Sequence, residues 1–285
     1  MKPISTTETS FAIPFHHFGG TGKTLHFAHA NGFPPELYRQ FLSPFTDQFE
    51  VIGIKHRPLW QKTPQPSDDW DRVADDIIHF FDQKGLKNVI GMGHSLGAVS
   101  TMFAAIKRPD LFEKIILIEP VFLPVPLLLF IYYFPFPRKY KIKLNPLVDI
   151  TLNRKDVWEN KEEVYASYRK KKVFKQIPDE ILKDYIRFGI TTRSDGKVTL
   201  LYTKEWEAHF YSLAPRVWNK LKQIETPILG IRGAQTDTIL PSAWKRWKRL
   251  KPNHTFAEIK NAGHLVPLEK ANETATVIFD FLKKS

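Results

Sequence analysis

The residues with the clearest chemical meaning form the pentapeptide Gly93-His94-Ser95-Leu96-Gly97. It follows an apolar segment expected to be a strand, Asn88–Met92, and precedes a segment expected to be a helix, Leu96–Lys107. A tight turn between strand and helix needs small residues beside the serine, and it exposes the serine hydroxyl at the carboxyl end of the strand. Ser95 is therefore the candidate nucleophile, and the backbone N–H of Leu96 is a candidate anion donor.

A serine hydroxyl is a poor nucleophile at neutral pH until a base removes its proton, so a histidine oriented by a carboxylate must follow. The order expected for this turn is serine, then acid, then histidine. The apolar segment Ile228–Ile231 runs into a loop that contains Asp237, and Thr255–Ile259 runs into a loop that contains His264. Because the carboxyl ends of parallel strands meet at one edge of a sheet, the sequence predicts Asp237 as the orienting acid and His264 as the base.

Apolar periodicity predicts the elements that position these residues. Strand-like and helix-like segments alternate from Pro35 to Ile118, and the alternation resumes after Ala214. This order predicts an α/β fold with a mostly parallel central sheet covered by helices on both faces. The expected strands are 51–54, 88–92, 114–118, 228–231 and 255–259, and the expected helices are 35–48, 70–81, 96–107, 216–224, 242–250 and 271–282.

The helix that starts at Trp70 has the clearest pattern, because its apolar residues recur at helical spacing on one face. Ser67 is expected to cap its first turn and Gly85 to end it. Asp75 and Asp76 then fall on the exposed side of this helix.

The alternation stops at Glu119-Pro120, and the chain up to Ala214 is typical of helix and loop. This stretch is too long for an ordinary connection and predicts an inserted, mainly helical cap domain over residues 121–213, between core parts 1–120 and 214–285. The cap starts with the uncharged segment Val121–Pro137, which contains four prolines. Its prolines disfavour a membrane-spanning helix. Because the segment directly follows the strand next to the nucleophile strand, we expect it to overhang Ser95 as a wall of the substrate pocket.

The stretch Gly19–Thr24, GGTGKT, has part of the pattern of a phosphate-binding loop. The first glycine of that pattern belongs at position 17, where the chain has His17, and a buried strand follows instead of a helix. We therefore interpret the stretch as a glycine-rich turn that joins segments 11–18 and 25–30 into a β-hairpin, with no nucleotide bound.

Composition restricts the chemistry further. The 285 residues, 42% of them apolar, are enough for a large core. They contain no cysteine, so disulfides, thiolate nucleophiles and thiolate metal ligands are excluded. The histidines lack the paired spacing of metal ligands, and no metal is expected.

The charge of the chain is strongly basic, with a net value of +12. No nucleic-acid-binding signature accompanies it, so we interpret it as a solvated surface and expect no nucleic-acid partner. The basic run Arg169–Lys172 and the apolar segment Val121–Pro137 leave weak contact with an anionic membrane surface open as an alternative. The first residues, MKPISTTETSFAIPF, lack the pattern of a secretory signal peptide, and a cytoplasmic location is expected.

Together these motifs resemble the α/β-hydrolase family, in particular its cap-bearing serine hydrolases. The resemblance covers nearly the whole chain outside the cap. It implies an α/β-hydrolase fold and a catalytic triad of Ser95, Asp237 and His264. The motifs that carry it are His29-Ala30-Asn31-Gly32-Phe33, Gly-His-Ser-Leu-Gly at 93–97, Arg-Gly-x-x-x-Asp at 232–237 and Asn-Ala-Gly-His-x-x-Pro at 261–267.

The resemblance also implies an oxyanion hole, in which a backbone N–H of the loop His29–Phe33, here called the opening loop, lies beside the N–H of Leu96. The opening loop departs from the family's usual His-Gly pattern, so Asn31 and Phe33 are both candidates, and we assign Asn31. Glu119 is the alternative acid, since some relatives of this fold place the acid after that strand. His94 lies inside the turn and is expected to pack or to bond a loop.

The activity implied by the resemblance is that of a serine hydrolase, carboxylesterase-like or lipase-like, of the EC 3.1.1 class. Ser95 would attack a carboxylic ester with an apolar portion, His264 would transfer the proton, and Asp237 would hold the imidazole, with an acyl-enzyme intermediate and no cofactor. Hydrolysis of thioesters, amides or carbon–carbon bonds can use the same triad. A non-catalytic protein that binds lipid or a membrane surface on the same scaffold is the alternative from another class.

Overall fold

A seven-stranded sheet forms the centre of the molecule in a computed structural model that describes residues 12–133 and 145–283. The strand order is β1-β3-β2-β4-β5-β9-β10, with β1 antiparallel to β3 and every other neighbouring pair parallel. This confirms the expected α/β fold and its mostly parallel sheet. The strands are β1 (Phe15–Gly19), β2 (Thr24–Ala28), β3 (Glu50–Ile54), β4 (Val89–His94), β5 (Phe112–Ile118), β9 (Ile228–Gly233) and β10 (Thr255–Ile259).

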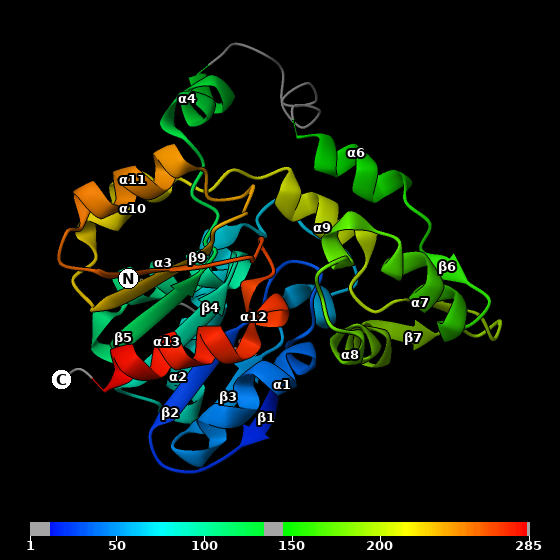
Figure 1. The fold of residues 1–285 in the computed structure, drawn as a ribbon, viewed down its shortest axis with the longest axis horizontal. Coiled ribbons are helices and arrows are strands. Elements are labelled where there is room, and N and C mark those ends of the chain that lie inside the picture. The colour runs from blue at the N-terminus through cyan, green and yellow to red at the C-terminus, as the bar shows by residue number, and fades with distance from the viewer. Residues whose placement is uncertain (1–11, 134–144, 284–285) are drawn as a thin grey trace, which may run out of the picture.

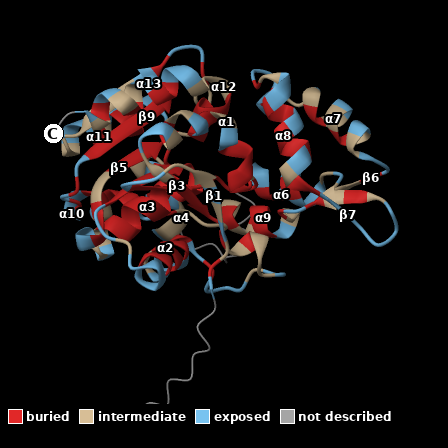
Figure 2. Cartoon of the chain, turned by 90° about the horizontal axis from the view of Figure 1, so that it is seen from below, coloured by how far each residue is buried: buried red, intermediate tan, exposed pale blue. Residues whose placement is uncertain are grey.

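Helices cover both faces of this sheet (Figure 1). One core cluster packs α2 (Trp70–Lys84), α3 (Leu96–Lys107), α10 (Val217–Gln223) and α11 (Pro241–Leu250) against one face. A second cluster packs α1 (Arg39–Leu42), α12 (Val266–Glu269) and α13 (Ala271–Leu282) against the other. The helices turn their buried residues toward the sheet (Figure 2). Short 3-10 turns complete this part of the chain at Pro35–Tyr38, Ser43–Asp47, Arg57–Leu59 and Pro109–Leu111.

The strand residues alternate between these two clusters. Along β5, Ile115 and Leu117 belong to the first cluster, whereas Ile116 and Ile118 belong to the second. Successive side chains of a strand point to opposite faces, so a sheet covered on both sides needs the continuous apolar run that β5 carries.

Helix α2 differs from the expectation at its start. Asp69 is the N-cap, and its Oδ1 accepts a hydrogen bond from the Arg72 N–H at 2.9 Å. The prediction of Ser67 is wrong because the helix begins at Trp70, one residue after Asp69. Gly85 ends the helix with φ of +66°, as expected.

Asp76, which the sequence predicted on the exposed side of α2, is buried. Arg57 donates two hydrogen bonds to its carboxylate, both at 2.7 Å, and this pairing stabilises the charge in a buried position.

The N-terminal hairpin predicted from the glycine-rich turn is wrong. Strand β3 lies between β1 and β2, and β2 is parallel to both of its neighbours, β3 and β4. The turn instead carries the chain across the start of β3, where a Cβ on Gly20 would lie 1.9 Å from the Phe49 carbonyl oxygen. Gly20 also has φ of +79°, so close approach and backbone conformation account for the glycine there.

Between β5 and α10 the chain leaves the sheet (Figure 1). The described elements are α4 (Val125–Tyr133), α6 (Pro146–Asn153), β6 (Val157–Trp158), α7 (Lys161–Arg169), a 3-10 turn at Lys172–Phe174, α8 (Asp179–Gly189), β7 (Ile190–Thr192), β8 (Val198–Leu200) and α9 (Lys204–Tyr211). Most are helices, but β6, β8 and β7 form a small antiparallel sheet. Strands of two or three residues are too short for their alternation to be recognised in the sequence.

The apolar segment predicted over Val121–Pro137 is described only as far as Tyr133, and its last four residues lie outside the described part. Within residues 12–133 and 145–283, no helix combines the length and the apolar character needed to cross a membrane. The division of the chain into a core and a cap at residues 121 and 213 stays a prediction.

Candidate active site

Ser95 occupies a strained turn between β4 and α3. Its backbone has φ of +54° and ψ of −111°, a region that non-glycine residues seldom adopt. The Ser95 N–H donates to the Ile118 carbonyl oxygen of the neighbouring strand at 2.9 Å, which fixes the turn against β5. A Cβ on Gly97 would lie 2.0 Å from the Ala28 carbonyl oxygen, and one on Gly93 would lie 2.4 Å from that of Gly97. Both glycines of the pentapeptide are therefore required by close backbone contact.

His264 lies within hydrogen-bond distance of this serine. It belongs to the loop that follows β10, and its Nε2 lies 3.0 Å from Ser95 Oγ. The structure thus brings together two sequence-predicted residues that are far apart in the chain. With Nε2 unprotonated, His264 can accept the hydroxyl proton, which is the arrangement that general-base catalysis requires.

The carboxylate on the other side of the imidazole belongs to Glu119. Its Oε2 lies 3.1 Å from His264 Nδ1, and the side chain is fully buried. The Gly233 N–H donates to Oε1 and the Thr236 hydroxyl donates to Oε2, both at 2.6 Å. A buried carboxylate needs such partners, and here they also hold it at a fixed position against the ring.

Asp237, which the sequence predicted at this position, lies elsewhere. Its side chain is exposed, and the contacts of the described residues include no hydrogen bond between Asp237 and His264. Glu119 follows β5 directly and has φ of +49°, which lets the side chain turn toward the sheet edge. Gly233 at the end of β9 and Thr236 in the loop that follows donate to Glu119, whereas Asp237, one residue further on, is exposed. Glu119, the alternative acid, is therefore the residue that contacts His264.

His94 connects the turn to the loop of His264. Its Nε2 lies 2.9 Å from the His264 carbonyl oxygen, and its Nδ1 lies 2.8 Å from the Tyr38 hydroxyl. A carbonyl oxygen only accepts hydrogen bonds, so Nε2 carries the proton and Nδ1 accepts from Tyr38. Burial lowers the pKa of His94 well below its usual value, which keeps the ring neutral in this role.

Hydrogen bonds of the Asn31 and His29 side chains hold the predicted oxyanion loop, residues 29–33, on two sides. The Asn31 amide nitrogen donates to the Glu207 carbonyl oxygen at 3.0 Å, and its Oδ1 accepts from the Tyr202 hydroxyl at 2.7 Å. On the other side, His29 Nδ1 donates to the Ala30 carbonyl oxygen at 2.9 Å, and Nε2 accepts from the His56 N–H at 3.0 Å. Burial lowers the pKa of His29 well below its usual value, so His29 orders the loop as a neutral ring.

The two oxyanion donors stay predictions. Leu96 begins α3, and amides of a first helical turn have no acceptor within the helix and lie at the positive end of its dipole. The Phe33 N–H donates to the Ala30 carbonyl oxygen at 3.2 Å. A substrate oxyanion would have to compete with that carbonyl at Phe33, which favours the assignment of Asn31 as the second donor.

The family of the chain follows from comparison with known proteins. The model of the family described as "Alpha/beta hydrolase family" matches residues 27–277, which is most of the chain. The chain belongs to the alpha/beta hydrolase family.

Three known proteins illustrate the range of this similarity. The "Uncharacterized hydrolase YugF" of Bacillus subtilis (strain 168) is 22% identical over 95% of this chain and 94% of its own length. "Ethanol acetyltransferase 1" of Hanseniaspora uvarum is 24% identical over 75% of this chain, and the match spans only 65% of that protein. The crystal structure of E-2-(acetamidomethylene)succinate hydrolase superposes with a TM-score of 0.78 and 20% identity, over 94% of each chain.

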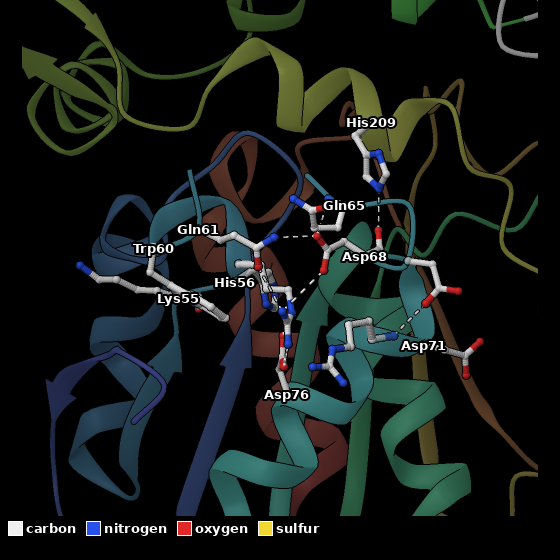
Figure 3. A network of polar contacts seen from close by, with 12 residues as sticks. Lys55, His56, Trp60, Gln61, Gln65, Asp68, Asp71, Asp76 and His209 are labelled. Carbon is white, nitrogen blue, oxygen red and sulfur yellow. Dashed lines mark hydrogen bonds and ion pairs between the residues drawn. The ribbon is translucent and has the colours of Figure 1, made fainter. Parts of the chain in front are cut away.

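In this alpha/beta hydrolase, α9 connects the oxyanion loop to the core. Trp206 Nε1 donates to the Gln61 carbonyl oxygen at 2.8 Å, and His209 Nε2 donates to the Asp68 carbonyl oxygen at 2.7 Å. The buried Asp68 carboxylate in turn accepts from the Gln61 amide at 2.8 Å and the Gln65 N–H at 2.7 Å (Figure 3). The contacts of Trp206 and His209 join residues more than a hundred positions apart, so no local sequence pattern predicts them.

Glu207 of α9 approaches the oxyanion loop most closely. A Cβ on Gly32, which has φ of +81°, would lie 3.0 Å from Glu207 Oε2. The same carboxylate receives two hydrogen bonds from the Arg154 guanidinium, so its charge is neutralised at this contact. Neither Glu207 nor Arg154 lies in a motif, so the sequence alone does not predict this contact.

Proposed function

We propose that this protein is a serine hydrolase that cleaves carboxylic esters through an acyl-enzyme. The observation that carries the proposal is the chain of hydrogen bonds from Ser95 Oγ to His264 Nε2, at 3.0 Å, and from His264 Nδ1 to Glu119, at 3.1 Å. A hydroxyl, an imidazole and a carboxylate in this order form the arrangement that activates serine nucleophiles on unrelated folds.

The reaction follows from the roles of these groups. Ser95 Oγ attacks the ester carbonyl carbon while His264 Nε2 takes the hydroxyl proton, and Glu119 stabilises the imidazolium. The N–H groups of Leu96 and Asn31 would bind the negative oxygen of the tetrahedral intermediate. His264 then gives the proton to the leaving alkoxide, which departs as the alcohol. Water attacks the acyl-enzyme by the same steps and releases the carboxylic acid.

Aromatic residues beside the opening loop support a substrate with an apolar portion. The Phe33 ring centroid lies 5.6 Å from that of Tyr185 and 6.3 Å from that of Phe174. Phe33 belongs to the same loop as Asn31, so an acyl or alcohol group bound at the oxyanion site would lie close to these rings. Each substrate CH₂ buried there adds about 0.8 kcal/mol, so we expect kcat/KM to rise roughly fourfold per group until the space is filled.

Acyl transfer to an alcohol is the second candidate, favoured by the similarity to "Ethanol acetyltransferase 1". The same acyl-enzyme serves both reactions, because an alcohol can attack it in place of water. The two are separated by supplying p-nitrophenyl acetate with ethanol and measuring ethyl acetate against free acetate. A product that is mainly ethyl acetate would make transfer the principal activity.

The nucleophile is tested with a fluorophosphonate probe and a series of p-nitrophenyl esters of increasing acyl length. We expect Ser95→Ala to abolish labelling and to reduce ester hydrolysis about a thousandfold or more, since only binding and the oxyanion donors remain. Ser100→Ala is the matched control, because Ser100 lies on the following helix, fully buried and away from the turn. Turnover of Ser95→Ala close to that of the parent would remove Ser95 as nucleophile. Absence of labelling in the folded parent would favour a non-catalytic scaffold.

A further inference from the structure

Helix α4 presents an apolar surface to solvent. Its nine residues, Val125–Tyr133, carry no charge, and only Leu128 among them is buried. It projects from the molecule beside α10 and α11 (Figure 1). A contiguous exposed apolar surface on a folded protein indicates a binding site. The exposed fractions of its large side chains are 42% for Leu127, 53% for Leu129, 38% for Phe130 and 78% for Tyr133.

Contacts with the core hold α4 in this position. Leu128 packs into the core cluster that contains α10 and α11. The Tyr132 hydroxyl donates to the Ala214 carbonyl oxygen, and just before the helix the Leu123 carbonyl oxygen accepts from Trp218 Nε1 at 2.8 Å. The side of α4 that bears Leu129 and Tyr133 is thereby kept in solvent.

Cationic side chains lie near both ends of α4. The Arg216 guanidinium lies 4.0 Å from the centroid of the Tyr132 ring. A cavity of about 360 Å³ separates the start of α4 from α11, and its lining includes Trp218 and the three cations Lys245, Arg246 and Arg249. The elements that supply these groups contain no acidic residue, since neither Asp nor Glu occurs in 121–133, 214–224 or 238–257. These three stretches therefore contribute only positive charge to the face.

We propose that this face docks the protein on an anionic phospholipid surface. The docking face comprises α4 with Arg216, Lys245, Arg246 and Arg249. The apolar side chains of α4 enter the boundary between headgroups and acyl chains, and the cations contact lipid phosphates. A helix of nine residues is about 14 Å long, which suits a position within one leaflet.

The charges decide between a lipid surface and a second copy of the chain as the occupant. A second copy placed against this face would bring its own cations close to these, and like charges repel. An anionic bilayer instead offers an apolar layer next to a negatively charged one, which matches the apolar and cationic parts of the face in kind. The inference does not depend on the ester hydrolysis proposed above, because the docking face shares no residue with the candidate active site.

Binding is measured by co-sedimentation of the full chain with vesicles of phosphatidylcholine, with and without phosphatidylserine. We expect binding to the phosphatidylserine vesicles, little binding to phosphatidylcholine alone, and release by high salt. Equal binding to both vesicles, or none to either, would overturn the proposal.

Variants locate the binding on this face. Tyr133→Glu changes the most exposed of the large side chains of α4 and should fold normally, and we expect it to lower the vesicle partition coefficient at least tenfold. Val173→Glu is its control, because Val173 is an exposed apolar residue at 49% that lies beyond α7. Unchanged binding of Tyr133→Glu, or equal loss with Val173→Glu, would overturn the assignment to α4.

The contribution of the cations is measured separately. In the double variant Lys245→Glu, Arg249→Glu, the vesicle partition coefficient should fall about fivefold for each positive charge removed. It should fall further because the two new carboxylates are repelled by the anionic lipid. Lys183→Glu on α8 is the control for charge alone, as α8 lies away from α4 and α11 (Figure 1). Sedimentation velocity of the parent tests whether a second copy of the chain occupies this face. A dimer that Tyr133→Glu dissociates would make the face an interface between copies and overturn the proposal.

Discussion

The Glu119 carboxylate is held at His264 by donors from a neighbouring strand and loop, and this gives the site its sharpest test. Glu119→Gln should lower kcat about 10³-fold to 10⁴-fold, because an amide neither stabilises the imidazolium nor enforces its tautomer. Asp237→Asn should change kcat less than about twofold, since Asp237 is exposed. Both are measured with one p-nitrophenyl ester at saturating concentration.

Thermal unfolding of the two variants provides the control for this comparison. Glu119 also accepts from the Gly233 N–H, so some loss of stability is expected in Glu119→Gln while the protein remains folded at the assay temperature. An inactive Asp237→Asn beside an active Glu119→Gln would return the role of the acid to Asp237.

The residues of the site differ in how far the sequence predicts them. Ser95 and His264 lie in contiguous motifs after apolar strands, and the structure places them in contact. Asp237 and Glu119 both follow strands that end at the same edge of the sheet, so strand order alone does not choose between them. The choice depends on the positive φ of Glu119 and on donors from Gly233 and Thr236, which are properties of the folded backbone.

At the scale of elements, the contact between β9 and α11 makes a specific prediction. A Cβ on Gly230 would lie 2.6 Å from Trp247 Cη2, and Trp247 is fully buried. Gly230→Ala should therefore destabilise the protein by about 1–3 kcal/mol through overpacking, measured by urea denaturation.

Gly189→Ala at the end of α8 is the matched control for Gly230→Ala. A Cβ there would meet Tyr185 at 3.6 Å, an ordinary contact, so the change should leave stability equal or raise it by up to about 1 kcal/mol. If both variants lose the same stability, steric contact with Trp247 is not the cause.

Elements with long periodic patterns were predictable, and short or edge elements were not. The sequence predicts α3 and α13 with the bounds that the structure has, because each is a run of twelve residues without proline. It places β1 beside β2 because a glycine-rich turn is typical of hairpins, whereas the sheet inserts β3 between them. Strand pairing depends on which edges remain free in the whole sheet, and a local turn does not contain that information.

At the scale of the whole molecule, buried neutral histidines make stability depend on pH. His26 is fully buried, neither of its ring nitrogens has a hydrogen-bond partner, and its ring packs against Phe80 and Phe81. Burial, with the nearby His29, lowers the pKa of His26 from 6.5 to about 3, and burial lowers the pKa of His56 to about 3 as well. The unfolded chain therefore binds more protons than the folded chain between about pH 3 and 6.5, and stability falls as the pH falls through this range.

His26→Phe tests this dependence at one position. It removes the protonation of the unfolded state and fills the same space with an apolar ring. Between pH 8 and pH 5 the free energy of unfolding of the variant should rise by about 2 kcal/mol relative to that of the parent. The reason is that below pH 6.5 protonation of His26 stabilises the unfolded state of the parent only. Urea denaturation at several pH values measures the gain, with His79→Gln on the exposed side of α2 as a control for loss of a histidine. A constant difference between variant and parent across this range would contradict the assignment.

The pairing of β5 with β9 has a consequence for the order in which the protein can be made. Ile115 pairs with Ile228, and everything between them is translated before the second partner exists. A nascent chain that ends before Ile228 has the outer edge of β5 open, an apolar strand with unpaired N–H and C=O groups. Such an edge is a template for association with other chains, so we expect the growing chain to be most prone to association in the interval before β9 is made.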